Sequence, residues 1–200
     1  MRLEATNHEN RTKVWMTDEE IEDLRRAAAS YRDDIIIQLG AYVGLRAFEV
    51  PQVQPQHVKE TENGQYRIRV PEGKDTSGNG GKPRDAFLPP DVERSLQQFA
   101  TAENIAPRDA FVELTERGVR AAVKRTAEAA ADQTGDEDFL QVSSHDLRRR
   151  FAQRLLVDKQ VNPRVVMQVG GWDSFAAIEP YLNSPTEDVV DEAFQEAGLV

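Results

Sequence analysis

The sequence contains no cysteine among its 200 residues. Without cysteine the protein has no disulfide framework, no thiolate nucleophile and no metal site with cysteine ligands. Long apolar runs are also missing, since no stretch reaches the roughly 18 to 20 apolar residues that a membrane helix needs. Residues 1–10 lack the apolar segment of a signal peptide. We therefore expect a soluble cytoplasmic protein with no membrane partner.

Lysine is scarce, and acidic residues are in excess. The chain has 35 acidic and 25 basic residues, a formal net charge of −10, and only 6 of the basic residues are lysine. An acidic, lysine-poor composition resembles that of proteins from salt-loving organisms. The net charge alone repels nucleic acid, but a hydrophobic content of 39% is that of a folded domain. The distribution of charge along the chain is therefore more informative than its sum.

Charge is unevenly distributed along the chain. Acidic groups occupy residues 18–23, 132–138 and 187–196. Between the last two groups, residues 141–168 contain six basic and two acidic side chains, a local surplus of four positive charges. Such a run is consistent with a solvated helix face or with a binding site for an anion.

Helical periodicity predicts two helices early in the chain. Thr17 and Glu20 form a capping box for a helix over about 18–30. A second helix begins at about 33–34, carries an apolar run and ends near Gly44, a residue type that commonly terminates helices.

A small antiparallel sheet is predicted next. Residues 65–70 and 85–88 alternate apolar and polar side chains, as half-buried strands do, and the glycine-rich residues 71–83 form a long hairpin loop. Downstream the chain is nearly all helix, with predicted starts at Pro90, Thr115, Ser143 or Ser144, Pro163, Ser174 and Pro185. The sequence therefore predicts a single domain of mixed α/β class, mainly α, with a small antiparallel sheet.

One predicted helix carries a histidine and an arginine on the same face. His145 and Arg148 are three residues apart near the helix N-terminus, where free amide groups and the helix dipole favour an anion. Leu147, Phe151 and Leu155 form the buried stripe of this helix. Such a pair is common by chance, so its meaning depends on the motifs that accompany it.

Four motifs occur in order along the chain. GLRAFE occupies 44–49, Gly-Lys occupies 73–74, HDLRRRFAQRLL occupies 145–156, and GGW ends at Trp172, nine residues before Tyr181. This ordered set resembles the tyrosine recombinases, the phage integrase family, from about Trp15 to Asn183. The resemblance implies the mainly helical catalytic domain of that family.

The resemblance implies a phosphate clamp. Arg46 and Arg148 would hold the non-bridging oxygens of a scissile phosphate, because a guanidinium fork donates two parallel hydrogen bonds to phosphate. Trp172 would donate its indole N–H to a phosphate oxygen and could not transfer a proton. We expect Glu49 and Asp146 to orient the arginines or the neighbouring backbone rather than to react.

The resemblance also implies a nucleophile with acid and base partners. Tyr181 would attack phosphorus, and His145 would accept the phenol proton. Lys74 would protonate the departing 5′ oxygen, and Lys82 and Arg84 are alternative cations in the same hairpin. This chemistry needs no metal and no nucleotide cofactor.

Partners and domains follow from the same resemblance. The expected partner is a double-stranded DNA attachment site, bound by a protein that is monomeric when free and forms a tetrameric synapse on DNA. The side chains expected to contact DNA are Arg149, Arg150, Arg154, Lys82 and Arg84. We expect an N-terminal extension at 1–16, a catalytic domain at 17–183 and an acidic tail helix at 184–200, without the N-terminal core-binding domain that the family usually carries.

Two other functions stay open at this point. A type IB topoisomerase uses a similar phosphate clamp and tyrosine, although the GLR, HxxR and GGW arrangement favours a recombinase. A DNA-binding regulator with the integrase fold would need none of the chemistry. The filled catalytic positions argue against the regulator, whereas the missing domain argues for it.

Overall fold

Helix α1 (Asp18–Ala27) begins at the predicted capping box. The Thr17 side chain accepts a hydrogen bond from the Glu20 amide, and the Glu20 carboxylate accepts one from the Thr17 amide. The computed structural model describes residues 1–5, 12–73, 82–182, 194–195 and 198. Within them α1 ends at Ala27, earlier than the predicted Ser30, because Ser30 is the N-cap of the next helix.

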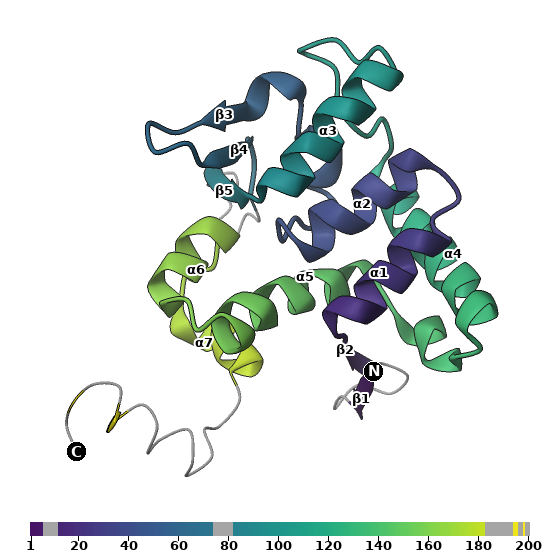
Figure 1. Cartoon of the computed structure of the whole chain (residues 1–200), viewed down its shortest axis with the longest axis vertical. Helices are drawn as coiled ribbons and strands as arrows, with labels where there is room; N and C mark the ends of the chain where they lie inside the picture. Colours follow the sequence, from purple (N-terminus) through teal and green to yellow (C-terminus); the bar gives the residue numbers. More distant parts are fainter. Residues whose placement is uncertain (6–11, 74–81, 183–193, 196–197, 199–200) are drawn as a thin grey trace.

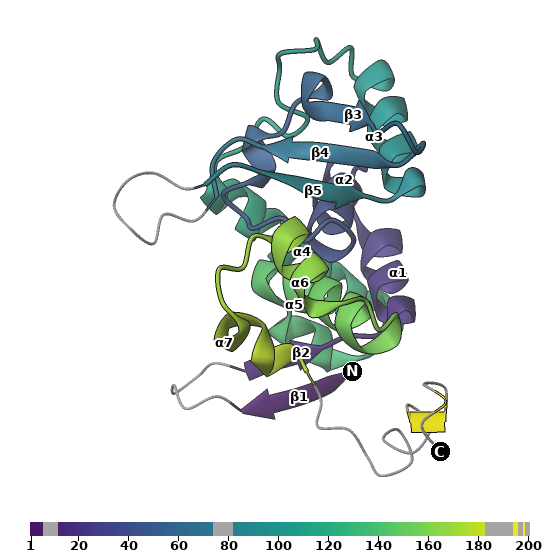
Figure 2. The same cartoon turned by 90° about the vertical axis from the view of Figure 1, so that its left-hand side faces the viewer.

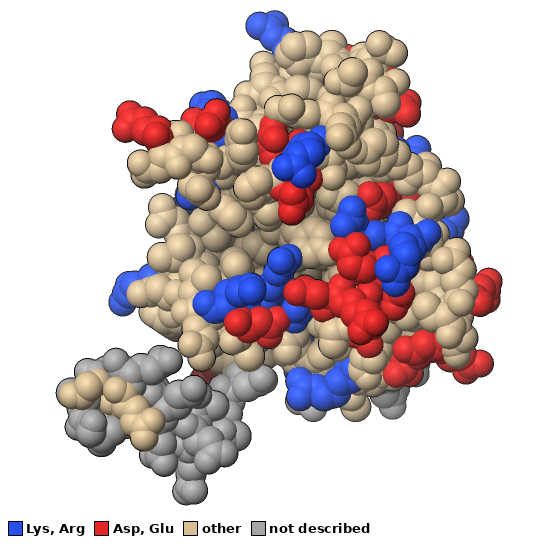
Figure 3. All heavy atoms as spheres, viewed as in Figure 1, with Lys and Arg blue, Asp and Glu red and all other residues tan. Residues whose placement is uncertain are grey.

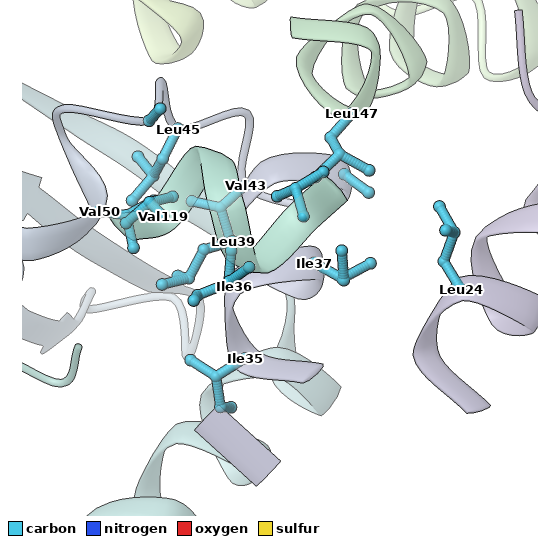
Figure 4. Close-up of a cluster of buried hydrophobic side chains, with 14 of the residues drawn as sticks. Leu24, Ile35, Ile36, Ile37, Leu39, Val43, Leu45, Val50, Val119 and Leu147 are labelled. Atoms are coloured by element: carbon cyan, nitrogen blue, oxygen red, sulfur yellow. The ribbon is translucent and has the colours of Figure 1, made fainter. Parts of the chain in front are cut away.

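Helix α2 (Tyr31–Ala41) lies at the centre of the core. Its isoleucines and leucine are fully buried, as expected for a helix that is apolar all round. Burying one such side chain stabilises the fold by about 1.5–3 kcal/mol. Figure 4 shows these side chains beside those of neighbouring helices and the following turn, among them Leu24, Val43, Leu45, Val119 and Leu147.

The turn after α2 directs the chain toward a later helix. Gly44 has a φ of 75°, a left-handed conformation that glycine adopts without steric cost. The Leu45 amide donates to the Leu39 carbonyl at 2.9 Å. A Cβ on Gly44 would collide with the Phe151 ring. This close approach places Arg46 next to helix α5 (Ser144–Gln153).

A three-stranded antiparallel sheet follows the short 3₁₀ turns η1 (Val50–Gln52) and η2 (Pro55–His57). Its strands are β3 (Val58–Glu60), β4 (Tyr66–Val70) and β5 (Arg84–Leu88). The predicted strands at 65–70 and 85–88 are confirmed as β4 and β5, whereas β3 was not predicted. One face of the sheet is buried, and Arg84 shares that face with Ala86 and Leu88.

Helices form most of the rest of the molecule (Figures 1 and 2). They are α3 (Pro90–Ala102), α4 (Glu116–Thr134), the 3₁₀ turn η3 (Glu137–Gln141), α5, a π-helical turn η4 (Arg154–Asp158), α6 (Pro163–Gly170), α7 (Phe175–Ile178) and the 3₁₀ turn η5 (Glu179–Tyr181). The mixed, mainly α class is confirmed. The predicted helix after Pro185 falls almost entirely outside the described residues.

The N-terminal residues form a hairpin that the sequence did not reveal. Strands β1 (Arg2–Ala5) and β2 (Thr12–Trp15) pair antiparallel. The Val14 amide donates to the Asp146 carboxylate at 3.0 Å, which joins β2 to α5. The expected extension at 1–16 therefore contributes Val14 to the core. Within the described part of the chain, no helix is long and apolar enough to span a bilayer.

Alanine at Gly44 should destabilise the fold more than alanine at Gly135. Both glycines have a φ near 75°, but a Cβ on Gly135 would meet nothing within 4 Å. Gly135→Ala should therefore cost only the left-handed strain of about 1–2 kcal/mol. Gly44→Ala adds an overpacking cost of about 1–3 kcal/mol against Phe151. Urea denaturation of the two variants measures the difference, and equal losses would show that the Gly44–Phe151 approach does not constrain the fold.

Candidate active site

Three arginines from separate segments meet at the C-terminal end of α6. The last carbonyls of a helix have no partner within it and form the negative end of its dipole. Here guanidinium groups supply the missing donors: Arg84 Nε to Val169 O at 3.2 Å, Arg148 Nη2 to Gly170 O at 2.7 Å, and Arg46 Nη2 to Gly171 O at 3.1 Å. The end of α6 thus brings the three cations together.

A buried glutamate binds two of these arginines. Glu49 is 0% exposed, and its two carboxylate oxygens accept from Arg84 at 2.7 and 2.8 Å. The same oxygens accept from the Arg46 side chain and from the Arg46 amide, each at 2.8 Å. Burial acts to raise the pKa of Glu49, but the bonds and charge of Arg84, followed by those of Arg46, hold that pKa below its usual value. Glu49 is therefore ionised and orients Arg46, as the sequence predicted.

Arg148 is held almost entirely inside the protein. It is 2% exposed, donates to the Gly44 and Gly170 carbonyls, and its guanidinium lies 4.0 Å from the centre of the Trp172 ring. Burial, followed by the nearby charge of Arg46, lowers the pKa of Arg148 to about 9. Three guanidinium groups against one carboxylate leave an excess of two positive charges, which an anion would neutralise.

Trp172 and Tyr181 lie beside this cluster. Gly171 ends α6 with a φ of 69°, and the Trp172 amide returns to the Met167 carbonyl at 3.0 Å. The Trp172 ring lies 5.8 Å from the Tyr181 ring, centre to centre. Tyr181 is 8% exposed. An ionised Tyr181 would act to raise the pKa of Arg148, which places the phenol within electrostatic reach of that guanidinium.

His145 is the second residue of α5 and is exposed to solvent. Asp146 anchors this helix start, because its carboxylate accepts bonds from the amide and hydroxyl of Ser143. Desolvation by the surrounding protein, followed by the charge of Arg149, lowers the pKa of His145 below its usual value. This lowering favours the neutral imidazole, which is the form able to accept a proton.

Five of the six predicted catalytic residues converge in this region. Arg46, Arg148, Trp172 and Tyr181 are linked through α6 and the aromatic rings, and His145 precedes Arg148 by one helical turn. The sixth, Lys74, lies outside the described residues. Among the residues that are described, no three His, Asp or Glu side chains could hold a metal ion together.

Comparison with known proteins gives the family of the chain. The phage integrase family model matches residues 14–187. The chain belongs to the phage integrase family. No curated protein matches the sequence.

Solved structures of recombinases share the fold. The chain matches the XerA recombinase with a TM-score of 0.67 at 20% identity, covering 92% of this chain and 65% of that one. It matches the XerH site-specific recombinase bound to difH with a TM-score of 0.65 at 21% identity, covering 90% and 53%. For the Tn1549 transposon integrase with transposon right-end DNA, the TM-score is 0.68 at 14% identity, covering 96% and 69%. The chain thus spans about half to two thirds of the length of these recombinase chains.

Three arginines that the sequence placed at a DNA surface are buried instead. Arg84 is 8% exposed and bonded to Glu49. Arg149, 8% exposed, pairs with Asp146. Arg150, 5% exposed, pairs with two acidic side chains, Asp18 and Asp158. These corrections have one physical cause, which is that each guanidinium neutralises a carboxylate of the same chain.

The remaining DNA-contact predictions fall on more accessible side chains. Lys82 is exposed, and Arg154 is 34% exposed, with Asp18 at 3.8 Å. These two stay predictions. Figure 3 shows acidic side chains gathered over α1 and basic side chains next to them near α5. Of the acidic run at 18–23, Asp18 pairs with Arg150 and lies 3.8 Å from Arg154, so it offsets part of the basic run seen in the sequence.

The imidazole of His145 should titrate below its ordinary pKa, and Arg149→Gln should raise that pKa. The substitution removes a repelling charge and leaves Asp146, which favours the imidazolium, without its cationic partner. Histidine NMR titration would measure both values. His57, whose pKa is lowered by burial and by the separate cations Arg69 and Lys59, is an internal control that should not move. An unchanged His145 pKa in Arg149→Gln would contradict this account of its environment.

Proposed function

We propose that this chain cleaves and rejoins DNA strands as a tyrosine-type site-specific recombinase, through a 3′-phosphotyrosine intermediate. The observation that carries the proposal is the position of Tyr181 beside a partly buried cluster with an excess of two positive charges. Such a cluster suits a phosphodiester, since the phosphate gains charge in the transition state and the guanidinium groups are fixed in advance.

The reaction conserves the energy of the phosphodiester. The Tyr181 oxygen attacks phosphorus, the bond from phosphorus to the 5′ oxygen breaks, and the phenol proton passes to His145. Lys74 is the proposed acid that protonates the departing 5′ oxygen. A 5′ hydroxyl of another strand then attacks the phosphotyrosine and releases Tyr181. The steps balance without a metal ion or a nucleotide.

The arginines act as donors to the phosphate. Arg46 uses Nη1 and Nη2 on Glu49 and Gly171, and Arg148 uses Nη1 and Nη2 on Gly44 and Gly170. A guanidinium carries five N–H donors, so each arginine keeps three for phosphate oxygens. The backbone bonds fix the forks in place, and fixed donors need no reorganisation during the reaction.

Tyr181→Phe should abolish covalent attachment to DNA and leave DNA affinity within a few fold, because only the attacking oxygen is removed. Since the target site is unknown, the protein is incubated with a randomised library of duplexes that carry nicks, and covalent adducts are captured under denaturing conditions and sequenced. Tyr66→Phe, in β4, is the matched control and should form adducts like the wild type. DNA binding without adduct by the wild type would favour a DNA-binding regulator, and adducts in Tyr181→Phe would exclude Tyr181 as nucleophile.

We further propose that the protein is monomeric when free and assembles as a tetramer on DNA. The support is the resemblance to recombinases and the apolar spacing of Val190, Ala193 and Phe194 after the nucleophile in sequence. Phe194 is 49% exposed in the structure. A tail of this kind would pack on a neighbouring protomer, and a contact of this size is too small to hold subunits together without DNA.

Truncation after Asn183 should therefore leave a folded domain that binds one half-site but does not join into a synaptic complex. Native gel electrophoresis with DNA, together with circular dichroism of the free domain, measures assembly and folding separately. Unfolding of the truncated chain, or normal assembly on DNA, would contradict packing of the tail on a neighbour.

A further inference from the structure

Arg84 contacts each of the three segments that build the site. Its Nη1 and Nη2 bond both oxygens of Glu49, which follows Arg46 in the turn after α2. Its Nε bonds the Val169 carbonyl at the end of α6. Arg84 itself is the first residue of β5, which forms a hairpin with β4. One side chain therefore joins the Arg46 turn, the hairpin and the segment that leads to Trp172.

The space around Arg84 is closely fitted. Gly171 has a φ of 69°, and a Cβ there would lie 2.8 Å from Arg84 Cδ. The arginine stem thus passes against the backbone of a residue whose carbonyl also binds Arg46. A shift of Arg84 would disturb the α6 end and the Arg46 side chain together.

The two carboxylate oxygens of Glu49 are shared unequally by two arginines. Arg84 takes both oxygens with parallel bonds, and the Arg46 side chain reaches one of them through Nη1 alone. The side chain of Arg46 is 20% exposed, whereas that of Arg84 is 8% exposed. The more accessible arginine is therefore the one that is less engaged by the carboxylate.

We propose that Arg84 is a positioning residue, which occupies Glu49 so that the Arg46 fork stays available to the phosphate. This inference rests on the proposed function of the same site. Without Arg84, the buried carboxylate would need its full compensation from Arg46, because an unpaired buried charge is strongly unfavourable. Arg46 would then turn toward Glu49 and away from the substrate.

The proposal predicts that a second substitution restores adduct formation to an Arg84 variant. Arg84→Met should slow covalent adduct formation by about 10² to 10³-fold, the loss expected when one donor to a transition-state oxyanion is removed. Adding Glu49→Gln removes the charge that captures Arg46, so the double variant Arg84→Met/Glu49→Gln should recover to within about tenfold of the wild type. A purely structural role predicts the opposite, since the second substitution would remove further native bonds.

Two control variants distinguish misplacement of Arg46 from a general loss of stability. Arg25→Met removes another carboxylate-bound arginine, which lies in α1, pairs with Glu22 and Asp34 and has no part in the proposed site. It should lower the thermal midpoint without slowing adduct formation in the folded protein. Arg84→Lys keeps the charge but loses the fork, so it should cleave at a rate between those of Arg84→Met and the wild type. Circular dichroism establishes that each variant is folded at the assay temperature.

A second measurement is independent of catalysis. Inorganic phosphate, at constant ionic strength, should raise the thermal midpoint of the wild type, because a ligand of the folded state stabilises it. This rise should disappear in Arg84→Met and return in the double variant. If the wild type forms no adduct, the proposed function fails while the phosphate series still decides the role of Arg84. The proposal is overturned if Arg84→Met keeps both responses, or if the double variant recovers neither.

Discussion

The carboxylate of Glu49, buried and shared by two arginines, is the interaction on which the arrangement of the site depends. A buried carboxylate is unfavourable unless it is fully paired, so the fold must bring guanidinium groups to it. Arg46 comes from the turn after α2, and Arg84 comes from the start of β5. Both arginines also bind carbonyls at the end of α6. Arg46 and Arg84 thus connect three distant segments, through this carboxylate and through the carbonyls at the α6 end.

The electrostatics of the protein operate on two length scales. Over the whole chain the formal net charge is −10. At the α6 end the balance is reversed, and the carbonyl dipoles that hold the arginines stabilise the cations without neutralising them. A carbonyl contributes only a partial charge, whereas a carboxylate contributes a full one. The site can therefore stay electropositive inside an acidic molecule, while arginines elsewhere, such as Arg149 and Arg150, are neutralised by carboxylates.

Local sequence signals predicted much of the fold and the site. Capping residues located the starts of α1 and α5. The ordered motifs named Arg46, His145, Arg148, Trp172 and Tyr181, which the fold brings into one region. The hairpin β1–β2 and strand β3 were missed because strands of three or four residues carry too little periodicity to be distinguished from loops.

The buried arginines could not be recognised from charge alone. Whether an arginine faces DNA or a carboxylate depends on partners that are distant in sequence, such as Asp18 for Arg150. Arg84 did carry a local signal. It lies in phase with Ala86 and Leu88, and residues two apart on a strand share a face. Applying that alternation to Arg84 would have predicted that its side chain lies on the buried face of the strand.

Tyr181 belongs to a small apolar cluster that is separate from the main core. Its buried neighbours are Trp15, Ala152, Leu156, Val166 and Ile178. Free energies of local opening vary across a protein and are lowest where few apolar contacts hold a segment. The segment from α6 to η5 therefore rests on a smaller apolar cluster than α2 does, and the arginine bonds at the α6 end tie it to the rest of the site. The hydroxyl of the proposed nucleophile is thus carried by a segment whose position depends on polar bonds to the arginines as well as on apolar packing.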